Sequence, residues 1–215
     1  IRANNLTGGI PAELGKLKHL ATLRLRGNKI TGPIPPEVMH STSLTYLVLS
    51  NNHLNGSVPT ELGSLKILDY LDLSNNNLSG LITEEHFANL KSLNSIDLTS
   101  NNLKIVVDSD WHSLFRLQNA DFRSCQIGPL FPAWLRQLRG ITKLDISSTG
   151  LDDKFPDWFW YTFSRTLHLD ISNNQISGSL PAHLDGMALE TLSLTSNRLT
   201  GSIPSLLANI TALDI

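Results

Sequence analysis

Cysteine is nearly absent from the sequence: Cys125 is the only one in 215 residues, and a lone cysteine cannot form a disulfide bond within the chain. An excess of charge is also missing. The 17 Lys and Arg face 19 Asp and Glu, and a formal net charge of −2 gives no reason to expect binding to nucleic acid or to an anionic membrane. No apolar run approaches the roughly 20 residues that span a bilayer. The sequence thus predicts neither a disulfide framework nor a membrane span in this segment.

Signatures of catalysis are missing as well. The sequence has no G-x-S-x-G, P-loop, dinucleotide-binding or H-E-x-x-H motif, and its seven histidines lack the spacing of metal ligands. His168 and Asp170 share a strand surface, but no nucleophile or oxyanion-stabilising group accompanies them. We therefore predict that the chain is not an enzyme and that it uses no catalytic residues, metal or cofactor.

Leucine and asparagine are abundant, and they form a repeat of the type L-x-x-L-x-L-x-x-N-x-L-x-G-x-I-P. The steps between successive Asn positions are 24, 24, 24, 25, 24, 24, 25 and 23 residues. The residues at this position are Asn4, Asn28, Asn52, Asn76, Asn101, Cys125, Thr149, Asn174 and Asn197. Such regular spacing indicates a leucine-rich repeat array.

Each part of the repeat predicts a local structure. The L-x-L segment alternates as a short strand does, so stacked repeats build one parallel sheet along the concave face of a solenoid. The Asn side chain turns inward and bonds backbone groups that the bend leaves unpaired, and we interpret Cys125 there as a small buried residue. The G-x-I-P segment favours a short second strand, and P-x-x-L-x-x-L favours 3₁₀ or short helical turns on the convex side. The predicted fold class is an α/β solenoid with a horseshoe shape.

Some segments depart from the repeat. The β-branched run at 105–107 suggests an extended segment held by apolar burial, and we interpret 84–86 as a solvated turn. Ile1 falls on the second leucine position of a strand, Leu213 matches the first leucine of another repeat, and no polar caps flank the array. We expect one solenoid over residues 1–215, with about nine repeats and both ends cut within a repeat, as in an internal slice of a longer array.

Aromatic residues concentrate at 131–134 and 155–163. Alignment on the repeat places Phe159 in an inward leucine position, with Trp158 and Trp160 beside it on the outer arc. Together with Trp134, these two tryptophans form a candidate partner patch, because exposed aromatic side chains favour interfaces. The alternative is that the large rings cover additional core beside a one-residue insertion.

The concave face is the predicted ligand-binding surface. Between the two strand leucines, five successive repeats carry aspartate, which would form an acidic ridge with a spacing of roughly 4.8 Å. Hydroxyl groups in the next column would relieve the repulsion between these carboxylates. The ridge is either structural or part of the ligand site, and residues outside the consensus are the better candidates for specificity. The candidates are Arg24, Arg26, Tyr46, Tyr70, Asp72, Asp97, Asp121, Arg123, Lys143, Asp145, His168 and Asp170.

Several motifs carry a family resemblance. The G-x-I-P repeat resembles plant-specific leucine-rich repeats. The segments S-C-Q-I-G-P-L-F-P-A-W-L at 124–135 and L-D-I-S-S-T-G-L at 144–151, followed by P-D-W-F-W at 156–160, are more specific. They resemble plant receptor-like proteins of the fungal-xylanase-receptor and disease-resistance class, over essentially the whole chain. The resemblance implies a plant-type horseshoe in a secreted ectodomain on the outer side of the plasma membrane, attached to a single span and signalling through a co-receptor kinase.

Four N-x-[ST] sequons, at Asn5, Asn55, Asn77 and Asn209, avoid the inward position and favour secretion, with glycans on some of them. The resulting hypothesis is a segment that senses a microbial protein or peptide elicitor in defence signalling. The alternatives are the ectodomain of a receptor kinase in development, a secreted inhibitor of pathogen cell-wall-degrading enzymes, or an inactive truncated product. A kinase encoded downstream would favour the first alternative, and a short complete gene would favour the second.

Overall fold

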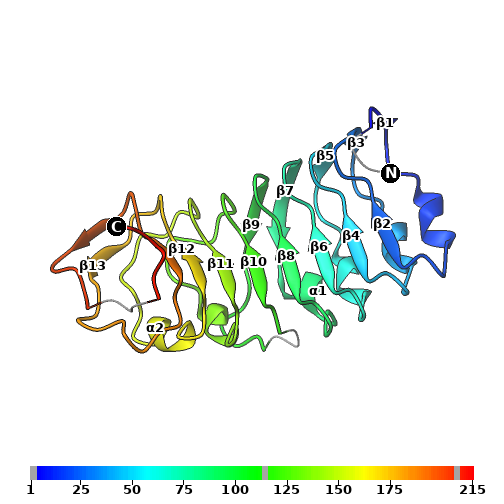
Figure 1. Cartoon of the computed structure of the whole chain (residues 1–215). Helices are drawn as coiled ribbons and strands as arrows, with labels where there is room; N and C mark the ends of the chain where they lie inside the picture. The colour runs from blue at the N-terminus through cyan, green and yellow to red at the C-terminus, as the bar shows by residue number, and fades with distance from the viewer. Residues whose placement is uncertain (1–3, 113–115, 206–208) are drawn as a thin grey trace.

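The computed structural model describes residues 4–112, 116–205 and 209–215, which form a curved solenoid (Figure 1). The predicted strand position of Ile1 lies outside these residues. Within them, nine short strands form one parallel sheet on the concave face, in the order β16-β14-β12-β11-β10-β8-β6-β4-β2. They are β2 (Thr22–Arg24), β4 (Tyr46–Val48), β6 (Tyr70–Asp72), β8 (Ser95–Asp97), β10 (Asn119–Asp121), β11 (Lys143–Asp145), β12 (His168–Asp170), β14 (Thr191–Ser193) and β16 (Ala212–Asp214). The predicted α/β horseshoe is confirmed.

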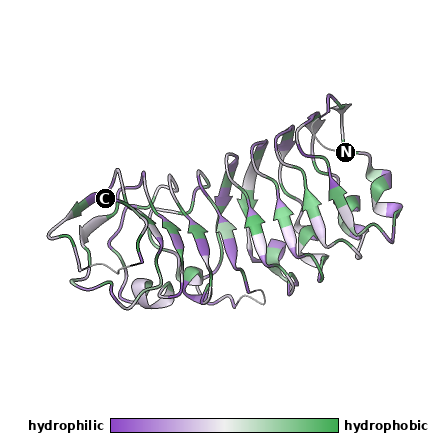
Figure 2. Cartoon of the chain, in the orientation of Figure 1, coloured by the Kyte–Doolittle hydropathy of each residue, from purple (hydrophilic) through white to green (hydrophobic). Residues whose placement is uncertain are grey.

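The register of this sheet follows the sequence repeat. Leu23 pairs with Leu47, and Leu47 pairs with Leu71, and each of the three leucines is buried in one continuous core. The residues on either side of them point to the opposite face, as the alternation of a strand requires. Most strands of this sheet therefore carry both hydrophobic and hydrophilic residues (Figure 2). The core runs along the array because each repeat buries its leucines against those of its neighbours.

The short second strands form a sheet on one flank. In the described residues five of them pair in the order β1-β3-β5-β7-β9, and β13 pairs separately with β15. They are β1 (Thr7–Gly8), β3 (Lys29–Gly32), β5 (His53–Gly56), β7 (Asn77–Ile82), β9 (Asn102–Ile105), β13 (Ser177–Ser179) and β15 (Arg198–Thr200). The second sheet is thus interrupted between β9 and β13, where single bridges join Lys104 to Gln126 and Lys154 to Ser177.

The β-branched run beside this interruption is less buried than we predicted. Strand β9 ends at Ile105, which is buried, but Val106 is 45% exposed. Val106 donates its backbone N–H to the carbonyl oxygen of Ile82 at 2.9 Å, so the inter-repeat pairing holds the backbone even though the side chain faces solvent. The expectation that burial holds the whole run is therefore wrong for Val106.

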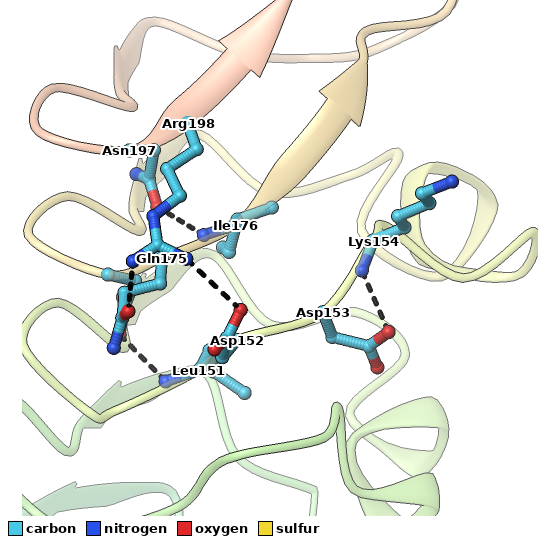
Figure 3. A network of polar contacts seen from close by, with 9 residues as sticks. Leu151, Asp152, Asp153, Lys154, Gln175, Ile176, Asn197 and Arg198 are labelled. Carbon is cyan, nitrogen blue, oxygen red and sulfur yellow. Dashed lines mark hydrogen bonds and ion pairs between the residues drawn. The ribbon is translucent and has the colours of Figure 1, made fainter.

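A polar network lies where the second sheet resumes (Figure 3). The Arg198 guanidinium donates to the side-chain oxygen of Gln175 at 2.5 Å and lies 3.7 Å from the Asp152 carboxylate. The Gln175 backbone N–H donates to the carbonyl oxygen of Leu151 at 2.7 Å. The carboxylate of Asp153 accepts the backbone N–H groups of Lys154, at 2.7 Å, and of Phe131, at 3.2 Å. Side chains therefore provide part of the coupling between repeats on this flank.

The inward asparagines form a ladder, as predicted. The side-chain oxygen of Asn52 accepts the backbone N–H of Ile30 at 3.1 Å, and its amide donates to the carbonyl oxygens of Leu25, at 3.1 Å, and Leu49, at 3.0 Å. Similar bonds involve Asn28, Asn76, Asn101, Asn174 and Asn197. Cys125 is fully buried in the same position, and burial raises the pKa of its thiol to about 12, so the interpretation as a small buried residue is confirmed.

The convex side consists of short helical turns, which confirms the prediction. These are the 3₁₀ helices η1 (Ala12–Lys16), η2 (Pro36–His40), η3 (Thr60–Ser64) and η4 (Ala133–Gln137), and the α-helical turns α1 (Glu84–Phe87) and α2 (Phe159–Thr162). No helix in the part of the chain that the structure describes is long and apolar enough to cross a membrane.

The interpretation of 84–86 as a solvated turn is wrong. His86 belongs to α1 and is buried, with Nε2 3.0 Å from the carbonyl oxygen of Val58. Its Nδ1 accepts the backbone N–H of Thr83 at 3.0 Å, as the third helical residue of a capping box does. The T-x-x-H spacing was the sequence signal for this arrangement.

Candidate functional site

The strand register collects most of the predicted ligand-binding residues into two rows on the concave face. One row contains Thr22, Tyr46, Tyr70, Ser95, Asn119, Lys143, His168, Thr191 and Ala212. The other contains Arg24, Val48, Asp72, Asp97, Asp121, Asp145, Asp170, Ser193 and Asp214. The two rows flank the inward leucines, so their side chains share the outward surface of the sheet.

The first three strands of the concave sheet, β2, β4 and β6, carry an aromatic and cationic surface. The Arg24 guanidinium lies 4.9 Å from the centre of the Tyr46 ring, within the range of a cation–π contact. The Tyr46 and Tyr70 rings are stacked, with centres 6.0 Å apart and planes at 28°. Together with Arg26, Val48 and Asp72 these side chains line a depression of about 170 Å³. Burial, and secondly the nearby Asp72, raises the pKa of Tyr70, so the phenol is neutral at physiological pH.

Two aspartates of the acidic ridge are structural. Asp72 is buried and accepts hydrogen bonds from the hydroxyls of Ser50 and Ser74, both at 2.6 Å. Asp145 is buried and accepts the hydroxyl and the backbone N–H of Ser147, at 2.6 and 2.9 Å. The predicted relief by a hydroxyl column is confirmed. Of the two interpretations of the ridge, these contacts favour the structural one for Asp72 and Asp145, because both residues are buried and their carboxylates already accept hydrogen bonds.

The other three aspartates of the ridge are half-buried. Asp97 accepts the backbone N–H of Thr99 at 3.0 Å and also its hydroxyl, and Asp170 accepts the backbone N–H of Ser172 at 2.9 Å. In the repeat of Asp121, the residue two positions after the aspartate is Arg123, which has no hydroxyl group to donate to the carboxylate. Its backbone N–H lies 3.3 Å from the Asp121 carboxylate.

The electrostatics of Asp121 follow from this position. Burial is the largest cause that raises its pKa, and the flanking carboxylates of Asp145 and Asp97 add to it, so the pKa reaches about 6. A cationic partner near Asp121 would favour its charged form.

Two further depressions extend this surface. The first of these lies next to the tyrosine depression, has a volume of about 220 Å³, and includes Tyr70, Asp97, Asp121 and Lys143 in its lining. The other lies toward the C-terminal strands and has a volume of about 380 Å³. It is lined by Lys143, Leu144, Asp145, His168, Leu169, Asp170, Thr191, Leu192, Ser193, Ala212 and Asp214. The depressions share Tyr70 and Lys143 with their neighbours, so they form one continuous surface along the sheet.

Sequence reasoning missed two acidic residues near the C-terminal strands of the concave sheet. Asp214 continues the acidic row on β16. The assignment of Leu213 to the first leucine of its repeat is wrong, because Leu213 pairs with Leu192 at the centre of the strand and so places Asp214 in the row. Glu190 lies 4.0 Å from Nε2 of His168, whose Nδ1 is 3.1 Å from the Thr191 hydroxyl oxygen. Among the described residues, no group of three or more His, Cys, Asp or Glu side chains is arranged to hold a metal ion.

The aromatic patch is only partly as predicted. Trp134 is 3% exposed and packs edge-on against Phe122 with ring centres 5.8 Å apart, so its assignment to a partner patch is wrong. Trp158 and Trp160 are half-exposed, and Phe159 is fully buried as the repeat alignment predicts. Trp134 and Phe159 are therefore core residues, while Trp158 and Trp160 cover the margin of the core.

All four sequon asparagines are exposed. Asn55 lies on β5 and Asn77 on β7, and the two are paired in the second sheet. The Asn102 side chain donates to the Asn77 side-chain oxygen at 3.2 Å. Asn5 and Asn209 also face solvent, so the fold leaves each of the four sequons accessible.

Comparison with known proteins assigns the class. A model of the leucine-rich repeat family matches residues 18–78, 42–103 and 139–199, which together cover more than half of the chain. The chain therefore belongs to the leucine-rich repeat family.

The relatives are plant receptors. The chain is 36% identical over 133 residues to the receptor-like protein EIX2 of Solanum lycopersicum, a match that covers 60% of this chain and 13% of that protein. The structure is similar to that of the plant peptide hormone receptor RGFR1 in complex with RGF2, with a TM-score of 0.80 and 27% identity over 99% of this chain and 34% of that one. It is also similar to the Arabidopsis receptor kinase HAESA in complex with the peptide hormone IDA and the co-receptor SERK1, with a TM-score of 0.75 and 28% identity over 94% of this chain and 34% of that one. The resemblance to plant receptor-like proteins is confirmed.

Proposed function

We propose that this chain is a ligand-recognition segment of a plant cell-surface receptor-like protein, facing the extracellular side of the plasma membrane. Its concave face binds a protein or peptide elicitor, and the bound ligand recruits a co-receptor kinase in defence signalling. The observation that carries the proposal is the continuous concave surface from Arg24 to Asp214, on which three depressions join. A rigid preformed surface of this kind binds an extended ligand at little cost in ordering the receptor.

The charge distribution supports a peptide of mixed charge. Arg24 and Arg26 supply positive charge beside the stacked tyrosines, and Arg26 is exposed. Asp97, Asp121 and Asp170 supply negative charge further along the sheet, where Asp121 lacks a hydroxyl partner at its own repeat. A ligand with an acidic group at one end and basic side chains toward the other meets complementary charge along its length.

The relatives support the same role. RGFR1 is a peptide hormone receptor in complex with RGF2, and HAESA is a receptor kinase in complex with a peptide hormone and a co-receptor. These two structural neighbours favour, as a second candidate, the ectodomain of a receptor kinase that binds an endogenous peptide. The sequence similarity to EIX2 favours the receptor-like protein. A kinase sequence in the full gene decides for the second candidate, and a short cytosolic tail decides for the first.

The test is a selection of peptides from a displayed random library on the immobilised 1–215 chain. We expect the selected peptides to compete with one another and to lose binding to the double variant Tyr70→Ala/Arg123→Ala. The matched control is Tyr161→Ala/Arg165→Ala, which removes the same two residue types from exposed positions away from the concave face. Equal binding to wild type and to the concave variant, with both chains folded by circular dichroism, would refute the proposal.

A further inference from the structure

Exposed basic residues precede successive strands of the nine-stranded sheet, so they belong to the edge of the solenoid at which these strands begin. Five consecutive repeats each contribute one exposed cation to this row, which we call the basic edge. Its residues are Lys66, Lys91, Arg116, Arg139 and Arg165. The concave acidic ridge and the sequon asparagines of the second sheet lie on other sides of the molecule.

Backbone hydrogen bonds fix the spacing of the basic edge. Each of the five residues lies two or three positions before a residue of a stacked row formed by Asp69, Asn94, Gln118, Thr142 and Leu167. From Asn94 onward, each backbone N–H of this row donates to the carbonyl oxygen of the preceding residue in the row, at 2.8 to 2.9 Å. Neighbouring parallel strands lie roughly 4.8 Å apart, so the cations follow the array at one charge per repeat.

The cations of the basic edge form no salt bridge within the part of the chain that the structure describes. The salt bridges found there join His168 to Glu190 and Arg198 to Asp152, and neither involves the basic edge. Asp69 is the carboxylate nearest in sequence to Lys66, but it is half-buried and does not approach Lys66 within 4.0 Å. Five like charges in a line concentrate positive potential along this edge despite the net charge of −2.

One end of the basic edge is a recess. Arg139 and Arg165 line it together with Gly140, Tyr161, Thr162 and Ser164, and its volume is about 380 Å³. None of these lining residues carries a carboxylate. The Tyr161 side chain is 74% exposed, so a flat amphipathic ring stands beside two guanidinium groups. Guanidinium groups bind carboxylates in a bidentate manner, and the tyrosine ring offers an apolar surface to a sugar ring.

We propose that the basic edge binds a linear polysaccharide whose sugar units carry carboxylates. A linear polyanion places its charges along a line, as the basic edge places its cations, whereas a compact protein partner distributes its charges over an area. The recess then holds one sugar unit, with its carboxylate between Arg139 and Arg165 and its ring against Tyr161. This binding is independent of the peptide recognition proposed for the concave face.

The experiment measures binding of the 1–215 chain to polygalacturonate and to the same polymer fully methyl-esterified, by titration calorimetry at several salt concentrations. We expect binding to the charged polymer that weakens with salt, and little binding to the ester. The variants Lys66→Ala/Lys91→Ala and Arg139→Ala/Arg165→Ala should each lower the affinity about 5- to 30-fold, from loss of two exposed charge contacts. Tyr161→Ala should lower the affinity without changing its salt dependence.

The control variant is Lys29→Ala/Lys104→Ala, which removes two exposed cations from the second sheet on the opposite flank. It should bind polygalacturonate as wild type does. Equal losses in the control and the basic-edge variants, or equal binding of the charged and esterified polymers, would overturn the proposal. Tighter binding to polyglutamate or to phosphatidylserine vesicles than to polygalacturonate would overturn it too, in favour of an acidic protein or a membrane. Circular dichroism melts confirm that each variant is folded.

Discussion

Replacing Asn52 with alanine tests the physical basis of the asparagine ladder. The Asn52 side chain is buried, accepts one backbone N–H and donates to the carbonyl oxygens of Leu25, Leu49 and Ser50 at 3.0 to 3.2 Å. A buried hydrogen bond contributes a net of about 1 kcal/mol, and the abandoned backbone groups have no replacement in the core. We therefore expect the free energy of unfolding to fall by about 3 to 4 kcal/mol.

Urea denaturation followed by circular dichroism measures this loss. At a denaturant dependence of about 1 to 3 kcal/mol per molar, the midpoint should fall by about 1 M or more. Amide hydrogen exchange gives a local readout, because the Ile30 N–H donates directly to the Asn52 side chain and should lose protection. The control is Asn55→Ala, at an exposed position, which should change stability by less than about 0.5 kcal/mol. An unchanged midpoint together with a protected Ile30 amide would refute the reasoning.

Three further perturbations have defined outcomes. Because the pKa of Asp121 is raised to about 6 in the folded chain, its contribution to stability is greatest below about pH 4 and is lost as pH rises through 6. Asp121→Asn should therefore raise the free energy of unfolding at pH 7.5 by about 1 kcal/mol, after allowance for solvent screening, and flatten its dependence on pH in urea denaturation. Gly128→Ala would place a Cβ 1.9 Å from the Gly150 carbonyl oxygen and should cost about 3 kcal/mol or more in the same assay, whereas Gly186→Ala, with no atom within 4 Å, should be nearly neutral. Phe159→Ala should cost about 3 to 5 kcal/mol in that assay too, because its ring is fully buried.

Regular parts of the fold could be predicted from the sequence because the repeat specifies them locally. The L-x-L spacing fixes which strand residues face inward, and the interval of about 24 residues fixes the register between neighbours. For the same reason, the two rows of concave residues were predicted as a set, and the structure brings them together. Stacking turns a spacing in sequence into a position on a surface.

The burial of individual side chains that depart from the repeat could not be predicted from the sequence. Trp134 is buried and packs edge-on against Phe122, which directly follows β10, and this contact depends on ring packing and not on the spacing of the repeat. His86 is buried because two backbone groups accept and donate at its ring, which makes a polar residue compatible with the core. Burial of Asp72 depends on a serine in the neighbouring repeat as well as on its own. The contacts of Trp134 and His86 are not encoded in the consensus. For Asp72, the repeat predicted the hydroxyl partners but not the burial of the carboxylate.

The interruption of the second sheet between β9 and β13 has a mechanical consequence. The resistance of a solenoid to bending between two adjacent coils depends on how many rows of backbone hydrogen bonds connect them. Over the coil that runs from Gln126 to Lys154, the described residues form no strand pair in the row of the second sheet. Isolated bridges and scattered backbone hydrogen bonds, such as that from the Asp152 N–H to the Pro129 carbonyl oxygen at 2.7 Å, replace the regular ladder, while the nine-stranded sheet continues. We therefore expect changes in the curvature of the solenoid to concentrate at this coil. A partner that binds both ends of the solenoid would bend it there and leave the outer coils unchanged.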